Sequence, residues 1–286
     1  MSMSRKFYFY RIENFRFNKS AVVQFVILCS IIWISNIFVQ CIFPTENNFP
    51  FIIRNLFAVT TVVLLLIGTK KLLAKNNITT DALGLSFSFK IFQHVLSGLF
   101  LAIAVLSIIG LFIYAFVPFH FERGTLSGSN AIKHASDFFW TNTLEEFIFR
   151  GFPLLVLSKM YGWKKAVWLL ALPFGLFHLY GMGLGTGALK MVLTTAAYSF
   201  VFCYAYLLTN SLVTAISVHW FSNILLHTIT GLDGQGNAML EPKFQTNWPI
   251  FDVGFLAFLL SEIVVAFFLF FLIKNKRSLR LSNIEK

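Results

Sequence analysis

Long apolar segments separated by short polar segments run through almost the whole chain. A membrane-crossing helix needs about 17–25 apolar residues, and eight segments suit that requirement. They run over residues 20–43, 52–69, 92–118, 136–157, 166–182, 188–209, 211–231 and 250–273. The pattern therefore predicts an all-α fold, a bundle of about eight transmembrane helices that forms a single integral membrane domain over residues 1–286.

Composition and charge support a membrane protein rather than a soluble one. Hydrophobic residues make up 57% of the chain and charged residues 12%, whereas a soluble domain carries about 25% charged residues. The net charge is +11, but the basic residues concentrate in short loops and at the two ends, with 17 on one side of the eight-span arrangement and 4 on the other. This asymmetry predicts that both termini are cytoplasmic and argues against nucleic-acid binding. The lipid bilayer is the predicted partner.

The fourth segment contains the stretch LEEFIFRG, which places Glu145, Glu146 and Arg150 among apolar residues. One charge at a helix centre costs about 2.5–3.5 kcal/mol on insertion scales, so these side chains should be paired, buried among helices or hydrated. Glu146 and Arg150 have the i, i+4 spacing of an ion pair on one helix face. Glu145 points about 100° away from them and has no local partner. A packing network and a functional site both remain open for this segment alone.

Two further segments place polar side chains at a similar depth. The fifth carries His178, and the seventh carries His219 and Asn223 at the i, i+4 spacing that puts both on one helix face. At 1.5 Å per residue, Glu145, His178, His219 and Asn223 lie ~16, ~18, ~12 and ~18 Å from the inner face of a ~30 Å core. Hydrogen bonds between helices are the structural alternative for each residue. The common depth of all four instead favours one functional site.

A carboxylate, two imidazoles and an amide can together hydrolyse a bond with an activated water. A desolvated Glu145 can serve as the general base. His178 and His219 can hold a metal through neutral nitrogens or orient a water without one. Asn223 can donate to a developing oxyanion.

The same residues form three motifs that resemble those of the CPBP intramembrane proteases, the family that contains the CAAX prenyl endopeptidases and the bacterial Abi proteins. EEFIFR at 145–150 matches EExxxR, FGLFH at 174–178 matches FxxxH, and HWFSN at 219–223 matches HxxxN. Their order and spacing fit the family. The motifs define a predicted protease core over about 136–231. The resemblance also implies a multi-pass protein of a bacterial plasma membrane.

The resemblance implies a role for each matching residue. Glu145 would activate the water, His178 and His219 would position it with zinc, and Asn223 would complete the site. Glu145 and Asn223 are further candidate zinc ligands, and whether the metal is required stays open. The implied set is catalytic Glu145, Glu146, His178, His219 and Asn223, with Arg150 in support.

The leading functional prediction is therefore a membrane metalloendopeptidase of the CAAX protease type. Its substrate would be a membrane-associated peptide or protein, with prenylated CAAX tails as one candidate class. The first alternative is a non-catalytic membrane protein that confers immunity to a membrane-active peptide. The second is a transporter or proton relay, although the sequence contains no internal repeat and no pair of broken helices.

Three ionisable residues lie outside the motifs. Glu262 is deep in the eighth segment and is expected to pair with Arg150 or Arg54. Arg54 is near the outer end of the second segment, where its side chain can reach the membrane surface. His227 follows Asn223 by four residues and is expected to support the site from outside it, if at all.

Overall fold

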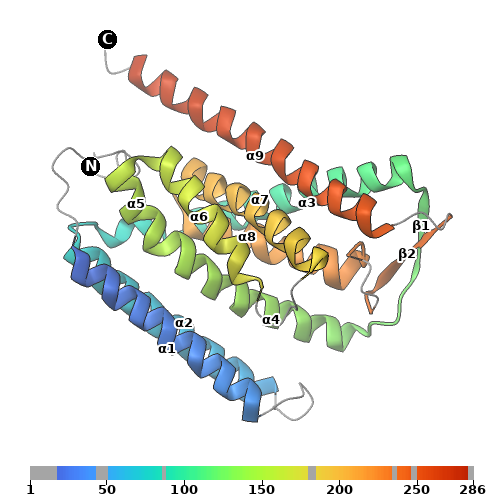
Figure 1. The fold of residues 1–286 in the computed structure, drawn as a ribbon, viewed down its shortest axis with the longest axis horizontal. Helices are drawn as coiled ribbons and strands as arrows, with labels where there is room; N and C mark the ends of the chain where they lie inside the picture. Colours follow the sequence, from blue (N-terminus) through green and yellow to red (C-terminus); the bar gives the residue numbers. More distant parts are fainter. Residues whose placement is uncertain are drawn as a thin grey trace.

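The computed structural model describes residues 18–42, 51–85, 88–179, 185–233, 237–245 and 250–282, which are almost entirely helical (Figure 1). Along the chain the elements are α1 (Lys19–Ile42), α2 (Phe51–Lys75), the 3₁₀ helix η3 (Thr80–Leu83), α3 (Lys90–Phe116), β1 (Phe119–Arg123), α4 (Gly128–Glu146), the π-helical turn η4 (Phe147–Gly151), α5 (Pro153–Tyr161), α6 (Trp163–Phe177), α7 (Thr186–Thr209), α8 (Leu212–Asn223), the π-helical turn η5 (Ile224–Thr230), β2 (Leu240–Phe244) and α9 (Ile250–Ser282).

Each of the eight predicted spans falls on a helix or on a continuous series of helices. Within the described ranges, five are long and apolar enough to cross a membrane: α2, α3, α7, the series α8–η5, and residues 253–276 of α9. The first two motifs lie outside these five, on the polar series α4–η4–α5 and at the end of the short helix α6, whereas the third motif lies on α8. A helical protein with several apolar membrane helices is therefore established, while the total of eight crossings remains a prediction. The charged ends at 1–17 and 283–286 lie outside the described residues.

The outward faces of the helices are apolar. Large hydrophobic side chains are strongly exposed on several of them, including Ile52 at 72% on α2, Leu111 at 69% on α3 and Trp168 at 69% on α6. A soluble protein rarely exposes so much contiguous apolar surface. Contact with lipid accounts for these faces, because lipid tails are as apolar as the side chains.

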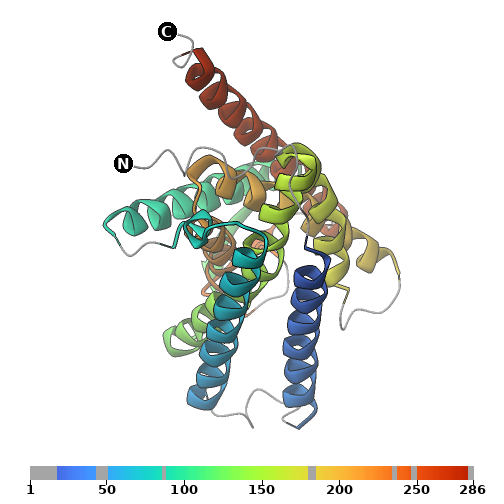
Figure 2. The same ribbon diagram turned by 90° about the vertical axis from the view of Figure 1, so that its left-hand side faces the viewer.

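The helices form a central group with a hairpin on one side. In the central group α3 packs on α8, α6 packs on α7, and α7 packs on α9. The hairpin of α1 and α2 joins this group through α2, which packs on α4 (Figures 1 and 2). The C-terminal part of α9 extends beyond the other helices in both views. Within this group, α8 packs on α3, α4 and α7.

Two glycines allow the close approaches on which this arrangement depends. A Cβ at Gly98 of α3 would lie 2.4 Å from the Cβ of Ser217 on α8. A Cβ at Gly175 of α6 would lie 2.5 Å from the carbonyl oxygen of Val192 on α7. Small residues at membrane-helix interfaces let two backbones approach closely. Gly175 thereby fixes the part of α6 that leads to His178.

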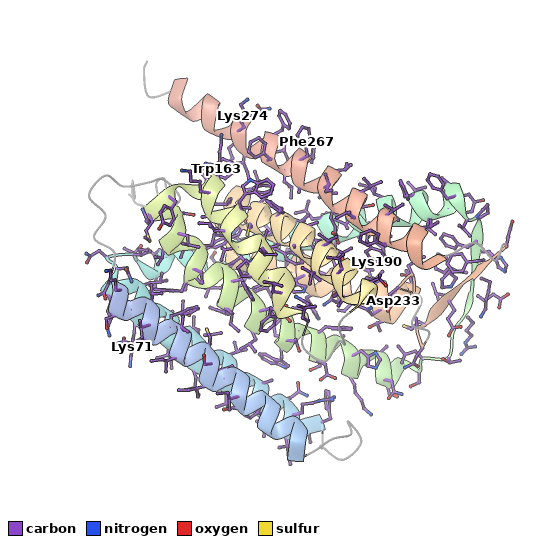
Figure 3. All side chains as sticks on the ribbon, viewed as in Figure 1. Lys71, Trp163, Lys190, Asp233, Phe267 and Lys274 are labelled. Carbon is purple, nitrogen blue, oxygen red and sulfur yellow. The ribbon has the colours of Figure 1, made fainter. Side chains whose placement is uncertain are left out.

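The two ends of the helical group carry different residues. Lys71, Trp163 and Lys274 lie toward the end where α2 and α9 finish and α6 begins, whereas Lys190 and Asp233 lie toward the opposite end (Figure 3). The lysines that follow the apolar parts of α2 and α9 therefore lie toward the same end of the helical group in this view.

The expectation of a purely helical chain needs one correction. β1 and β2 pair in antiparallel fashion from Phe119 opposite Phe244 to Arg123 opposite Leu240. Their sequences, FHFER and LEPKF, are only five residues long, and so short an alternation of apolar and polar residues gives a weak signal for a strand. The pairing closes the segment after α3 onto the segment after η5.

Candidate active site

The two glutamates of the first motif lie at the end of α4, where the regular α-helix changes into a π-helical turn. Glu145 and Glu146 are the last two residues of α4, and the π-helical turn η4 follows directly. A similar widening begins immediately after Asn223, the last residue of α8, where η5 starts. Single π-helical turns within α-helices occur frequently at functional sites because they reposition the flanking side chains. The glutamates of the first motif and the asparagine of the third motif therefore each lie next to a π-helical turn.

Glu145 faces both motif histidines. Its Oε2 atom lies 3.6 Å from Nε2 of His178 and 3.9 Å from Nε2 of His219. The Glu145 side chain is 9% exposed and that of His178 is 24% exposed. Oε2 itself is buried and has no hydrogen-bond partner within the protein. The three motif residues, from α4, the end of α6 and α8, thus converge on one small space.

The orientation of each imidazole is set by its other nitrogen. Nδ1 of His178 lies 2.8 Å from the carbonyl oxygen of Phe174, and this oxygen can only accept. Nδ1 of His219 lies 2.9 Å from Oε1 of Glu146, which also accepts from Nη1 of Arg150. With both Nδ1 atoms as donors, the Nε2 atom of each neutral imidazole is the one that lies near Glu145 and carries the lone pair.

Glu146 and Arg150 form the predicted ion pair. Nη1 of Arg150 donates to Oε1 of Glu146 at 3.1 Å, and both side chains are fully buried. Nη2 of Arg150 donates to Oγ and to the carbonyl oxygen of Ser199 on α7. The guanidinium lies over the ring of Phe174, 4.2 Å from its centroid. Glu146 therefore joins Arg150 to His219, and the pair acts as the fixed support of one imidazole.

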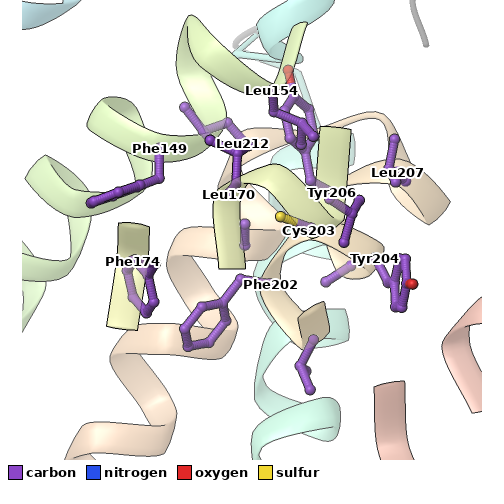
Figure 4. Packing of buried hydrophobic residues seen from close by; sticks show 14 of the residues in the cluster. Phe149, Leu154, Leu170, Phe174, Phe202, Cys203, Tyr204, Tyr206, Leu207 and Leu212 are labelled. Carbon is purple, nitrogen blue, oxygen red and sulfur yellow. The ribbon is translucent and has the colours of Figure 1, made fainter. Parts of the chain in front are cut away.

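Aromatic rings line the other sides of the histidines. The ring of Phe202 on α7 stacks on His219 with 4.4 Å between centroids and an interplanar angle of 22°. Phe174 contacts both His178 and His219 edge to face, at 4.7 and 6.0 Å. Phe174 and Phe202 lie close together in the buried core (Figure 4). These rings restrict the rotation of the imidazoles and lower the water content around them.

Asn223 lies one helical turn after His219 and bonds to α4 rather than to the histidines. Its Nδ2 donates to Oδ1 of Asn142 at 3.1 Å. Asn142 is on the same helix as Glu145, three residues before it. The motif asparagine is thus placed beside the Glu145 helix, next to the three converging residues.

Sequence reasoning missed three residues that hold the site together. Asn142, Ser199 and Phe202 contact a motif residue or its partner, although none belongs to a motif. Asn142 had the clearest signal, because it is an amide one turn before Glu145 in a membrane segment. Its Nδ2 atom is buried without a partner, at a cost of about 1–3 kcal/mol. Ser199 and Phe202 carry no comparable signal.

His227 is close to the site but is not one of the converging residues. Its Nδ1 lies 2.6 Å from Oδ2 of Asp233, and its ring lies 5.6 Å from that of Phe138 on α4. Phe138 is one turn before Asn142 on α4. His227 is therefore at the outer end of the contact between α4 and the α8–η5 series.

The expected pairing of Glu262 with Arg150 or Arg54 is wrong. Arg150 bonds Glu146 and Ser199, and Arg54 forms an ion pair with Asp137 of α4 at 2.8 Å. Glu262 is 2% exposed and its Oε2 atom has no hydrogen-bond partner. Each arginine instead pairs with an acidic residue of α4: Arg150 with Glu146 and Arg54 with Asp137.

We expect Glu262→Gln to leave both folding and peptide hydrolysis intact. The buried carboxyl on α9 packs toward α7 and α3 rather than toward α4, and an amide removes the cost of burying an ionisable group. The expected midpoint of thermal unfolding in detergent is equal to or above that of the wild type. A loss of activity with unchanged stability would instead place Glu262 in the chemistry.

The site has two nitrogen atoms suited to a metal and no third ligand in place. Ligating histidines usually donate their second ring nitrogen to a carboxylate or a backbone carbonyl, as His219 and His178 do here. Tetrahedral zinc with ligands at ~2.1 Å separates ligand atoms by ~3.4 Å, less than the 3.6 and 3.9 Å from Glu145. Within the described ranges, no group of three or more His, Cys, Asp or Glu side chains is arranged to hold a metal.

Comparison with known proteins identifies the same part of the chain. Residues 129–225 match the family described as type II CAAX prenyl endopeptidase Rce1-like. The matched range, about a third of the chain, runs from α4 to the beginning of η5 and includes all three motifs. No curated protein matches the chain at a significant level. The family resemblance predicted from the motifs is thereby confirmed, and it is that of a protease family.

Proposed function

We propose that the chain is an intramembrane endopeptidase that hydrolyses a peptide bond of a membrane-associated substrate with a Glu145-activated water. The observation that carries the proposal is the buried Oε2 atom of Glu145. It lies without a hydrogen-bond partner in the protein, 3.6 and 3.9 Å from the Nε2 atoms of His178 and His219. Three polar atoms from three parts of the chain therefore converge here without a hydrogen bond from Glu145 Oε2 to the protein. A site for water leaves them for the reacting molecule.

The proposed chemistry begins with the proton of a water molecule. A water between the three residues donates one hydrogen to Oε2 of Glu145 and the other to an Nε2 atom. Glu145 accepts the proton as the water oxygen attacks the carbonyl carbon of the substrate, which forms a tetrahedral oxyanion. Asn223 donates an N–H to this oxyanion. Glu145 then returns the proton to the leaving amine, and the peptide bond breaks.

Zinc remains part of the proposal, with His178 and His219 as its ligands. A cation would balance the site, because a single water near Glu145 Oε2, His178 Nε2 and His219 Nε2 would have only two hydrogens for three acceptors. When bound, zinc would act as a Lewis acid that makes its water a stronger nucleophile.

Metal analysis of purified protein tests the zinc proposal. We expect about one zinc ion per chain in the wild type and little in His178→Ala or His219→Ala, with chelators abolishing hydrolysis. His227→Ala is the matched control, since that histidine bonds Asp233 instead, and it should retain both metal and activity. A wild type that is active and free of metal would show that the histidines orient the water alone.

The substrate class is tested with quenched peptides in liposomes that contain the purified protein. The matched family predicts cleavage of a prenylated CAAX peptide in preference to the same peptide without the prenyl group. Cleavage by the wild type but not by Glu145→Gln would support the protease. If nothing is cleaved and Glu145→Gln retains the cellular phenotype, the protein is a non-catalytic binder. Uptake of solute or protons by sealed vesicles would support a transporter.

A further inference from the structure

Asn142 connects α4 to α8 at the level of the proposed site. Its side chain is 1% exposed, and its Oδ1 atom accepts the hydrogen bond from Nδ2 of Asn223. Glu146 lies four residues after Asn142 on α4, and His219 lies four residues before Asn223 on α8. Oε1 of Glu146 accepts a hydrogen bond from Nδ1 of His219. The two antiparallel helices are therefore joined by two cross-links with the same spacing, one to each residue of the HxxxN motif.

The cross-link between Asn142 and Asn223 orients the amide of Asn223. A side-chain amide can rotate by about 180°, which exchanges its oxygen and its NH₂ group. With Oδ1 of Asn142 as the acceptor, Asn223 presents its nitrogen to α4, the helix that carries Glu145. One N–H is used by Asn142, and the other remains for a developing oxyanion.

We propose that Asn142 is a positioning residue that holds the Asn223 amide with its NH₂ group directed to the reacting carbonyl. The proposal rests on the proposed function. Asn142 works through Asn223 and has no contact with the substrate. Its own Nδ2 atom, buried without a partner, is a cost that an apolar residue of the same size would avoid. Packing of α4 against α8 therefore does not explain why residue 142 is an asparagine.

A double-mutant cycle separates positioning from a structural role. Asn223→Ala should lower kcat by roughly 10²–10³-fold with little change in KM, as loss of an oxyanion donor does. Asn142→Leu, which keeps the branching and the number of heavy atoms, should lower kcat by roughly 10-fold or more in the same way. The double variant should be no slower than Asn223→Ala. The proposal would be overturned if the fold-reductions in kcat of the two single variants multiplied in the double variant. An unchanged kcat in Asn142→Leu would also overturn it.

A measurement independent of activity completes the test. In protein labelled with ¹⁵N-asparagine, the side-chain amide signal of Asn223 is identified by its absence in Asn223→Ala. Its hydrogens should exchange slowly with D₂O in the wild type and rapidly in Asn142→Leu, while the thermal midpoint changes little. Equal exchange in both proteins would overturn the positioning role. If no peptide is cleaved by the wild type, the proposed function fails, and this signal still decides whether Asn142 holds Asn223.

Discussion

Glu145→Gln should abolish peptide hydrolysis while the protein remains folded. The substitution keeps the shape of the side chain but removes the acceptor that takes a proton from the water, and general-base catalysis contributes about 10²–10⁴-fold to a rate. We expect kcat to fall by that factor and KM to change little, because the amide still occupies the same space. Rates would be measured in liposomes on the peptide that the wild type cleaves best.

The folded state of this variant is expected to be at least as stable as that of the wild type. Oε2 of Glu145 is buried without a hydrogen-bond partner, so an uncharged amide lowers the cost of desolvation. Glu262→Gln makes the same chemical change at another buried carboxyl and should remain active. Retention of more than about a tenth of the wild-type kcat in Glu145→Gln would exclude this residue as the base.

The sequence could predict those features of the site that follow from the regular spacing of residues along a helix. The i, i+4 relation between Glu146 and Arg150 predicted the observed ion pair, since neighbours on one helix face are fixed by helix geometry. Depth estimates placed Glu145, His178 and His219 in one layer, and the structure brings the Nε2 atoms of both histidines within 3.9 Å of the Glu145 carboxylate. Membrane helices of known direction leave few other arrangements.

The remaining features depend on contacts between helices, which a single sequence does not specify. The ion pair between Arg54 and Asp137 forms because α2 packs on α4. The hydrogen bond between Asn223 and Asn142 forms across the contact between α4 and α8. The widened turns η4 and η5 have no signature in the apolar pattern. Each of these is decided by which helix faces are paired.

Arg150→Met should destabilise the protein more than any other single change considered. Removing one member of a buried ion pair leaves the other uncompensated, at a cost of about 3–5 kcal/mol. Glu146 would then be a buried carboxylate with His219 as its remaining polar partner. The expected result is a large fall in the thermal midpoint in detergent. Arg54→Met is the matched control: its pair with Asp137 is 25% and 29% exposed, and such pairs contribute about 0–1 kcal/mol.

Replacing both members of the pair separates stability from catalysis. Apolar residues of similar volume often replace a buried ion pair without loss of stability, so Glu146→Met combined with Arg150→Met should recover most of the thermal midpoint. Activity should remain low, because Nδ1 of His219 loses the acceptor that directs its Nε2 toward Glu145. Recovery of both stability and activity would show that Glu146 serves only to neutralise Arg150. Recovery of stability alone would identify Glu146 as the residue through which the buried pair orients the imidazole.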